Sequence, residues 1–86
     1  MLEAVREALN EARKAIPVGS VWLHKKGGTY MVIGAGYDTE NGRANIHYYR
    51  IAGPDFNEQA EIGIVFDRPR FMWTPDRFTK VNPFHG

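Results

Sequence analysis

A histidine and two lysines come directly before a glycine pair within Trp22–Gly34, which reads Trp-Leu-His-Lys-Lys-Gly-Gly-Thr-Tyr-Met-Val-Ile-Gly. We expect His24 to end a strand beside a tight turn and to offer a hydrogen bond to a ligand, with Lys26 supplying positive charge next to it. The alternative is that the His24 imidazole bonds a backbone carbonyl and holds the turn, while Lys25 and Lys26 are solvated.

A second candidate pair, Tyr49-Arg50, ends a run in which apolar and polar residues alternate. Alternation puts one set of side chains on the core face of a strand and the other toward ligand or solvent. The predicted outer set is Asn45, His47 and Tyr49. Arg50 could clamp a phosphate or carboxylate through two parallel hydrogen bonds, a geometry that lysine cannot match. The alternative for Arg50 is a surface salt bridge worth under about 1 kcal/mol.

A third candidate is the segment Arg68-Pro-Arg-Phe-Met-Trp73, in which the proline fixes the backbone. One interpretation is a groove wall, where Arg68 or Arg70 contacts an anion and Trp73 stacks on a flat group. The other is a structural corner, where the arginines bond carbonyl oxygens and the aromatic side chains enter the core.

Catalytic chemistry finds little support. Ser20 is the one serine, and no nucleophile-elbow sequence surrounds it. His24, His47 and His85 lack the spacing typical of a metal site. Gly34-Ala-Gly36 is only part of a dinucleotide-binding loop, because the third glycine and the following helix are missing. We therefore expect neither an enzyme, nor a metal site, nor a cofactor.

Charge and composition narrow the class of protein. The 86 residues carry 11 Lys and Arg against 10 Asp and Glu, so bulk attraction to a nucleic-acid polymer is not indicated and only a local basic patch is expected. The absence of cysteine excludes disulfides and fits a reducing compartment. No apolar run approaches the roughly 18 residues that a bilayer requires. We predict a cytoplasmic protein with no membrane contact.

An amphipathic helix is predicted at the N-terminus. Apolar residues recur there at spacings of three and four: Leu2, Val5, Leu9, Ala12 and Ile16. This pattern predicts a helix over residues 2–16, which Pro17 ends. The apolar stripe either packs on the rest of the domain or pairs with a partner's helix, as in a homo-oligomer. The chain is thus divided into a helix over 1–17 and a β domain over 18–86.

The β domain is predicted to contain five strands, at residues 18–24, 29–35, 43–51, 61–67 and 77–81. Lys25-Lys-Gly-Gly28 and Asp38-Thr-Glu-Asn-Gly42 are expected to be tight turns, since paired glycines and Asn-Gly favour hairpins. Ile62, Ile64 and Phe66 alternate inward in the fourth strand. Two prolines then predict a bend and a short helical turn before the last strand.

These elements predict a mainly β fold, a small SH3-like five-stranded barrel with an N-terminal α-helix, and an OB-type barrel is the alternative. The sequence also resembles a known family. Trp22-x-His-x-Lys-Gly-Gly-x-Tyr-x-Val-x-Gly34, with the later Tyr49-Arg50, Arg68-Pro69 and Asp76–Val81, resembles short bacterial and phage domains of unknown function with the pattern Y-x-H-x-K-G-G-x-Y-x-V-x-G. Later segments of that family read V-Y-R and W-x-R-P-x-x-x-F.

The resemblance covers roughly residues 18–81 and implies an SH3-like barrel without an assigned activity. Three departures stand out: Trp22 replaces a tyrosine, Phe66 replaces a tryptophan, and the loop at 52–61 is longer. The first two keep aromatic character, whereas the longer loop could alter the mouth of a binding site.

The function predicted from the sequence is a non-catalytic binding module for an anionic or planar ligand. The ligand would be a nucleotide-like small molecule, as in phage sequestration of a signalling nucleotide, or a short single strand of nucleic acid. The predicted binding residues are His24, Lys26, Tyr49, Arg50, Arg68 and Trp73. The alternative is a protein-interaction module that uses the barrel groove or the N-terminal helix.

Overall fold

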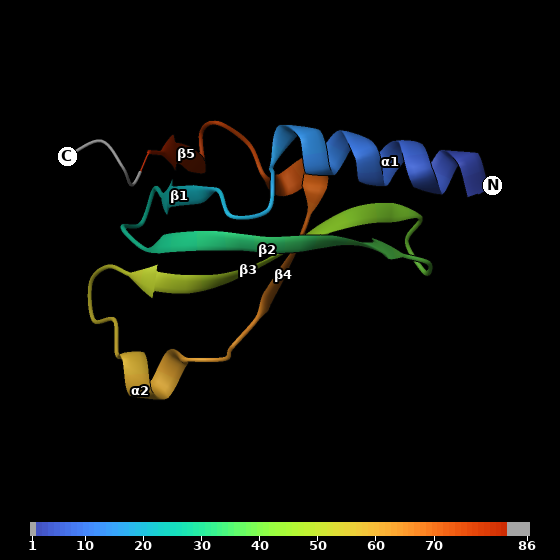
Figure 1. Cartoon of the computed structure of the whole chain (residues 1–86). Helices are drawn as coiled ribbons and strands as arrows, with labels where there is room; N and C mark the ends of the chain where they lie inside the picture. The colour runs from blue at the N-terminus through green and yellow to red at the C-terminus, as the bar shows by residue number, and fades with distance from the viewer. Residues whose placement is uncertain (1, 83–86) are drawn as a thin grey trace.

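The computed structural model describes residues 2–82 and consists of one five-stranded antiparallel sheet with an N-terminal helix (Figure 1). In chain order the elements are α1 (Leu2–Ala15), β1 (Val21–His24), β2 (Thr29–Asp38), β3 (Arg43–Ala52), α2 (Glu58–Glu61), β4 (Phe66–Pro69), the 3-10 turn η1 (Arg70–Met72) and β5 (Phe78–Val81). The last four residues of the predicted β domain, 83–86, lie outside the described residues. No helix in the described part is long and apolar enough to cross a membrane.

The strands lie in the order β4-β3-β2-β1-β5, and all neighbours are antiparallel. Strand β1 lies between β2 and the edge strand β5, because Val21 pairs with Met31 of β2 on one side and with Val81 of β5 on the other. No ladder joins β4 to β5 within residues 2–82, so the sheet is open. The predicted mainly β fold of five strands with an N-terminal helix is confirmed, although the fourth strand does not lie where it was predicted, and closure into a barrel is not seen.

Both predicted hairpin turns are present. Gly27 adopts a φ of 103° between β1 and β2, and Gly42 adopts 65° between β2 and β3. Such positive φ angles favour glycine. The second turn is further held by Asp38, whose carboxylate accepts hydrogen bonds from the backbone N–H groups of Glu40 and Asn41 at 3.0 and 3.2 Å. Local sequence therefore sets the ends of β1, β2 and β3.

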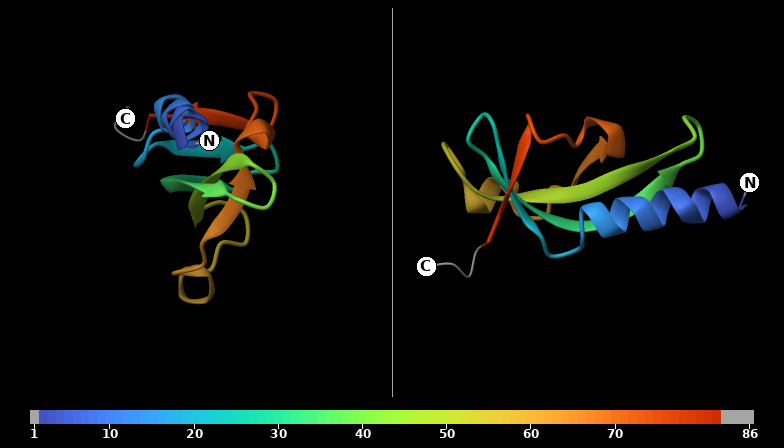
Figure 2. Two further views of the ribbon diagram at one scale, coloured as in Figure 1. Left: turned by 90° about the vertical axis from the view of Figure 1, so that its right-hand side faces the viewer. Right: turned by 90° about the horizontal axis from the view of Figure 1, so that it is seen from above.

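Helix α1 packs its C-terminal half on the sheet and leaves its N-terminal end uncovered. Ala12 is fully buried and Ile16, just past the helix, is nearly so, whereas Leu2 is 63% exposed. Arg70 fastens the helix to η1, because its Nε and Nη2 donate to the two carboxylate oxygens of Glu11 at 3.0 and 3.1 Å. Helices α1 and α2 lie on opposite sides of the strands (Figure 1, Figure 2). The apolar stripe thus packs within the chain over part of its length.

The core is built around two stacked rings. Trp73 and Phe78 are 4% and 2% exposed, and their ring centroids lie 3.8 Å apart with the planes 3° from parallel. The edge of Tyr48 faces Trp73 at a centroid distance of 5.0 Å. The other core residues come from α1 and its end, β2 and β3: Ala12, Ile16, Val32, Ala44 and Ile46. The predicted core face of β3, with Ala44, Ile46 and Tyr48, is confirmed.

The predicted fourth strand over 61–67 is wrong. Residues 58–61 form α2, which begins because the Asn57 side chain accepts hydrogen bonds from the N–H groups of Gln59 and Ala60. Strand β4 begins only at Phe66, and Ile62 is 73% exposed. The alternation of Ile62, Ile64 and Phe66 resembled a strand, but most of this segment has no neighbouring strand to pair with.

We predict that Phe78→Ala lowers the free energy of unfolding by about 3–5 kcal/mol, because it removes the ring on which Trp73 stacks and leaves a cavity. The matched control is Phe71→Ala, since Phe71 is 63% exposed. The control variant should lose less than about 1 kcal/mol. Urea denaturation followed by circular dichroism measures both, and equal losses in the two variants would contradict this account of the core.

Candidate functional site

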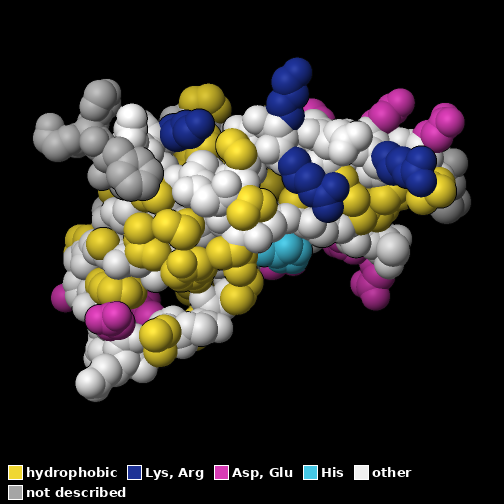
Figure 3. Space-filling view, viewed as in Figure 1, with side chains coloured by type: hydrophobic (Ala, Val, Ile, Leu, Met, Phe, Trp, Pro, Cys, Tyr) yellow, Lys and Arg dark blue, Asp and Glu magenta, His cyan; other side chains and the backbone are white. Residues whose placement is uncertain are grey.

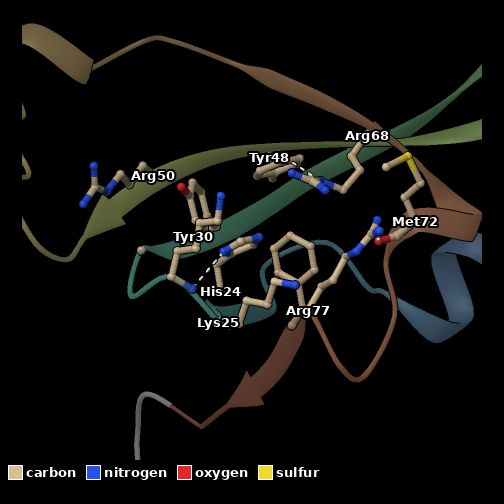
Figure 4. Close-up of a pocket in the computed structure, with 11 residues that line it drawn as sticks. His24, Lys25, Tyr30, Tyr48, Arg50, Arg68, Met72 and Arg77 are labelled. Atoms are coloured by element: carbon tan, nitrogen blue, oxygen red, sulfur yellow. Dashed lines mark hydrogen bonds between the residues drawn. The ribbon is translucent and has the colours of Figure 1, made fainter.

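Four of the six predicted site residues meet in one pocket: His24, Lys26, Arg50 and Arg68. The pocket has a volume of about 580 Å³ and lies between the β1–β2 turn, the inner side of β2 and β3, and the segment that leads into β5. In Figure 4, Lys25 and Arg68 extend toward the space beside His24, whereas the Arg77 guanidinium turns toward Met72. Its volume falls within the range of small-ligand sites.

The Phe78 ring connects this pocket to the core. Trp73 covers one face of that ring, and the Arg68 guanidinium carbon lies over the ring at 5.2 Å from its centroid. Arg68 Nε also donates to the Tyr48 hydroxyl at 3.1 Å. Two aromatic side chains therefore hold Arg68 in place, and its two terminal nitrogens remain to donate to an anion.

His24 is oriented by the turn that follows it. Its Nδ1 accepts a hydrogen bond from the backbone N–H of Lys26 at 3.1 Å, and its ring stands edge-on to Phe78 at a centroid distance of 4.9 Å. The expected alternative, a bond from the imidazole to a backbone carbonyl, is replaced by this bond from a backbone N–H. A neutral imidazole that accepts at Nδ1 carries its proton on Nε2, so His24 can donate from that atom.

The pKa of His24 is lowered from its usual value by partial burial and then by the positive charges of Arg68, Lys26, Lys25 and Arg77. All four cations act in the same direction on one imidazole, so positive charge is concentrated around His24. An anion placed among these groups would relieve that repulsion.

Lysine and arginine side chains are concentrated at this pocket. Five of the eleven in the chain line it: Lys25, Lys26, Arg50, Arg68 and Arg77. No Asp or Glu among residues 2–82 lines it. The near-neutral charge of the whole chain therefore conceals a strongly basic local site.

Arg50 lines the pocket, but its guanidinium is turned away from the other cations (Figure 4). Its Nη1 lies 3.4 Å from Glu61 Oε1, its Nε donates to the Ala52 carbonyl at 3.2 Å, and its Nη2 donates to the Pro54 carbonyl. The guanidinium also lies 5.8 Å from the ring centroid of Phe56. Arg50 thus fastens the loop before α2 through Nε, Nη1 and Nη2, which favours the salt-bridge alternative, and its role as a ligand clamp stays a prediction.

Tyr49 and Trp73 do not line the pocket with the other four predicted residues. Tyr49 follows Tyr48, which faces the core, so it projects from the opposite face of β3, where its hydroxyl contacts Met31 Sδ at 3.4 Å. Trp73 is buried against Phe78 and cannot offer a ring face to a ligand. The groove-wall interpretation of Trp73 gives way to the structural corner, as it does for Arg70, which bonds Glu11 and the Trp73 carbonyl.

Seven residues that line the pocket were not among the predicted site residues: Lys25, Gly28, Tyr30, Tyr48, Met72, Arg77 and Phe78. Arg77 and Phe78 stand in the segment Asp76–Val81, and Tyr30 stands in the first family-like motif, so a signal existed for each of these three. Presence in a motif was the only signal that these residues belong to the site. Their closeness to His24 could not be predicted, because the pairing of His24 with Phe78 across β1 and β5 joins residues far apart in the sequence.

A second polar cluster lies on the outer side of β3. His47 Nδ1 is 3.2 Å from Asp67 Oδ1, and Asn45 Nδ2 donates to Asp67 Oδ2 at 3.2 Å. This cluster joins β3 to the edge strand β4. Within residues 2–82 no group of three or more His, Asp or Glu side chains could hold a metal ion.

No family model, curated protein or solved structure matches this chain. The resemblance to short bacterial and phage domains therefore stays a prediction that its motifs carry. The chemistry of the site has to be argued from its own side chains.

We predict that the free energy of unfolding falls as the pH is lowered below about 6.5, the value of an unperturbed histidine. The folded pKa of His24 lies below that value, so in this window the unfolded chain binds the extra proton and is favoured. Urea denaturation at pH 7.5, 6.5 and 5.5 measures the trend. His24→Asn keeps an acceptor for the Lys26 N–H and should flatten the trend, whereas identical slopes in both proteins would show that His24 is not its cause.

Proposed function

We propose that this protein is a non-catalytic binding module for an anionic, planar ligand, either a nucleotide-like small molecule or a short single strand of nucleic acid. The binding site is the pocket formed by the β1–β2 turn, β3, β4 and the start of β5. We also propose that the sheet is an SH3-like scaffold. The strand order β4-β3-β2-β1-β5 and the 3-10 turn between β4 and β5 support that arrangement.

The observation that carries the proposal is the excess of cations over acids in the pocket. The pocket is surrounded by Lys25, Lys26, Arg68 and Arg77. The charge of Asp76 interacts with Lys25 and Arg77, but this residue is exposed and does not line the pocket. A hydrogen bond between charged partners contributes about 1.5–3 kcal/mol. Two or three such bonds give a small anion useful affinity without a large basic field.

Aromatic side chains supply the second half of the proposal. Tyr30, Tyr48 and Phe78 line the pocket, and Tyr30 is the one of these that is only partly buried. Its ring stands nearly perpendicular to those of Tyr48 and Phe78, at centroid distances of 5.3 and 6.5 Å. The accessible part of this ring, beside the cations, can stack on a base or other flat group, which is worth roughly 1–3 kcal/mol per base. The signalling-nucleotide hypothesis fits this combination.

We predict that ATP, used as a probe nucleotide, binds the wild-type protein and binds Arg68→Gln at least tenfold more weakly, since the variant loses a fixed, charged donor. Arg13→Gln is the matched control, because Arg13 lies exposed on α1 outside the pocket. Isothermal titration calorimetry measures the affinities. Native mass spectrometry of gently purified protein also reports any small molecule retained from cells. Equal affinity of the two variants, or no binding of ATP or oligo-dT to the wild type, would refute the proposed site.

The second candidate function is docking of a protein partner or a second copy of this chain. Its support is the apolar surface that the fold leaves uncovered. Leu2 at the start of α1 is 63% exposed, and apolar side chains gather over β1, β2 and β3 in the space-filling view (Figure 3). Leu23 and Ile33 are about two-fifths exposed, at 42% and 41%.

This candidate predicts that the chain self-associates and that Leu2→Gln with Val5→Gln abolishes the association. Both residues precede the buried part of α1, so the double variant should keep the wild-type fold, unlike deletion of the helix, which would remove Ala12 from the core. Sedimentation velocity at micromolar concentrations measures the oligomeric state. A wild-type monomer, or a dimer that persists in the double variant, excludes association through this helix.

A further inference from the structure

We propose that the pocket binds two or more adjacent phosphoryl groups, the di- or triphosphate part of a small ligand, and not the isolated phosphodiesters of a nucleic-acid strand. The inference rests on the proposed function and specifies its ligand. It assigns Arg68, Arg77 and Lys25 to the phosphoryl groups and Nε2 of His24 to a hydrogen bond with one of their oxygens.

Cations from three segments of the chain line the same pocket. Lys25 follows β1, Arg68 lies in β4 and Arg77 precedes β5, so three separate segments place positive charge around one space (Figure 4). The backbone N–H of Lys25 donates to the Arg77 carbonyl at 2.9 Å, which ties two of these segments together. A focus of fixed cations matches a compact polyanion, in which several charges lie within a few ångströms.

Arg68 and Arg77 keep N–H groups that can donate to a ligand. The contacts of Arg68 are the Tyr48 hydroxyl and the Phe78 ring, and Arg77 Nη1 donates to the Met72 carbonyl at 3.4 Å. Neither arginine forms an ion pair with a carboxylate in the described part of the chain. By contrast, Arg50 and Arg70 each pair with a glutamate. The fold thus separates two structural arginines from two that face the pocket.

The basic surface is confined to one pocket, which favours a compact ligand over a strand. A strand is bound by cations that follow its backbone along a groove, and its affinity comes from many phosphate contacts. Here the cations gather at one pocket of about 580 Å³, while the chain as a whole has a net charge of only +1. A compact ligand can be bound by this one pocket, whereas a strand draws its affinity from a longer row of phosphate contacts.

Ligand binding is expected to be coupled to protonation of His24, because of the charges that surround its imidazole. Around its imidazole stand Lys25 and Lys26 from the turn, Arg68 from β4, Arg77 before β5, and the uncharged rings of Tyr30 and Phe78. In the unbound protein partial burial and then the four cations disfavour protonation of the ring. A polyphosphate reverses the local charge, so its binding should draw a proton onto Nδ1 of His24 near neutral pH, at the expense of the hydrogen bond from the Lys26 N–H.

Titration calorimetry with inorganic phosphate, pyrophosphate and tripolyphosphate tests the inference, because these probes share their chemistry and differ in the number of phosphoryl groups. We expect affinity to rise about tenfold or more from phosphate to pyrophosphate. Oligo-dT should bind no more tightly than phosphate. Equal affinity for phosphate and pyrophosphate, or tighter binding of oligo-dT, would overturn the inference while leaving an anion site in place.

Variants assign the roles of the side chains. Arg68→Lys keeps the charge but loses the fork of donors, so it should weaken pyrophosphate binding more than phosphate binding. Titrations in buffers of different ionisation enthalpy report proton uptake, and His24→Asn should take up fewer protons than the wild type at pH 6.5. Unchanged uptake in that variant contradicts the role of His24. If no probe binds and ATP does not bind either, the proposed function itself fails.

Discussion

The stack of Phe78 on Trp73 is the contact on which both the core and the pocket depend. One face of the Phe78 ring packs on Trp73 at 3.8 Å, and the Arg68 guanidinium lies over the ring at 5.2 Å. His24 meets the same ring edge-on. A single buried ring therefore fixes the sheet, the 3-10 turn and two polar side chains of the site. Such sharing makes the site rigid, because those side chains cannot move without disturbing the core.

The arginines show how one residue type serves two purposes in a small domain. Arg70 joins α1 to η1 through Glu11, and Arg50 joins β3 to the loop and helix that precede β4 through Glu61. The second pair positions α2, in which no residue is buried. Arg68 and Arg77 are held by a hydroxyl, an aromatic ring and a carbonyl, which leave the positive charge in place. The partner of each arginine, and not its position in a motif, decides whether it can receive an anion.

Much of the fold could be predicted because its signals are local. The spacing of Ala12 and Ile16 in the helix stripe, and the glycines at 27 and 42, act through neighbouring residues, and these elements are found as expected. The prediction of a fourth strand over 61–67 was wrong because it, too, rested on local signals alone. Ile62 and Ile64 alternate as strand residues do, yet the Asn57 cap starts a helix before them and no strand lies beside them. Alternation describes which side chains could share a face, whereas a partner strand decides whether a sheet forms.

The sequence by itself determined the helix, the hairpins, the core face of β3 and the types of side chain available for binding an anion. Only the tertiary structure decided that His24, Lys26 and Arg68 share one pocket, that Arg77 joins them, that Arg50 is bound to its own loop, and that Trp73 is buried. The physical reason is distance along the chain. Turn and helix preferences act between neighbours, but the charge around His24 depends on segments brought together by the β1–β5 and β3–β4 pairings.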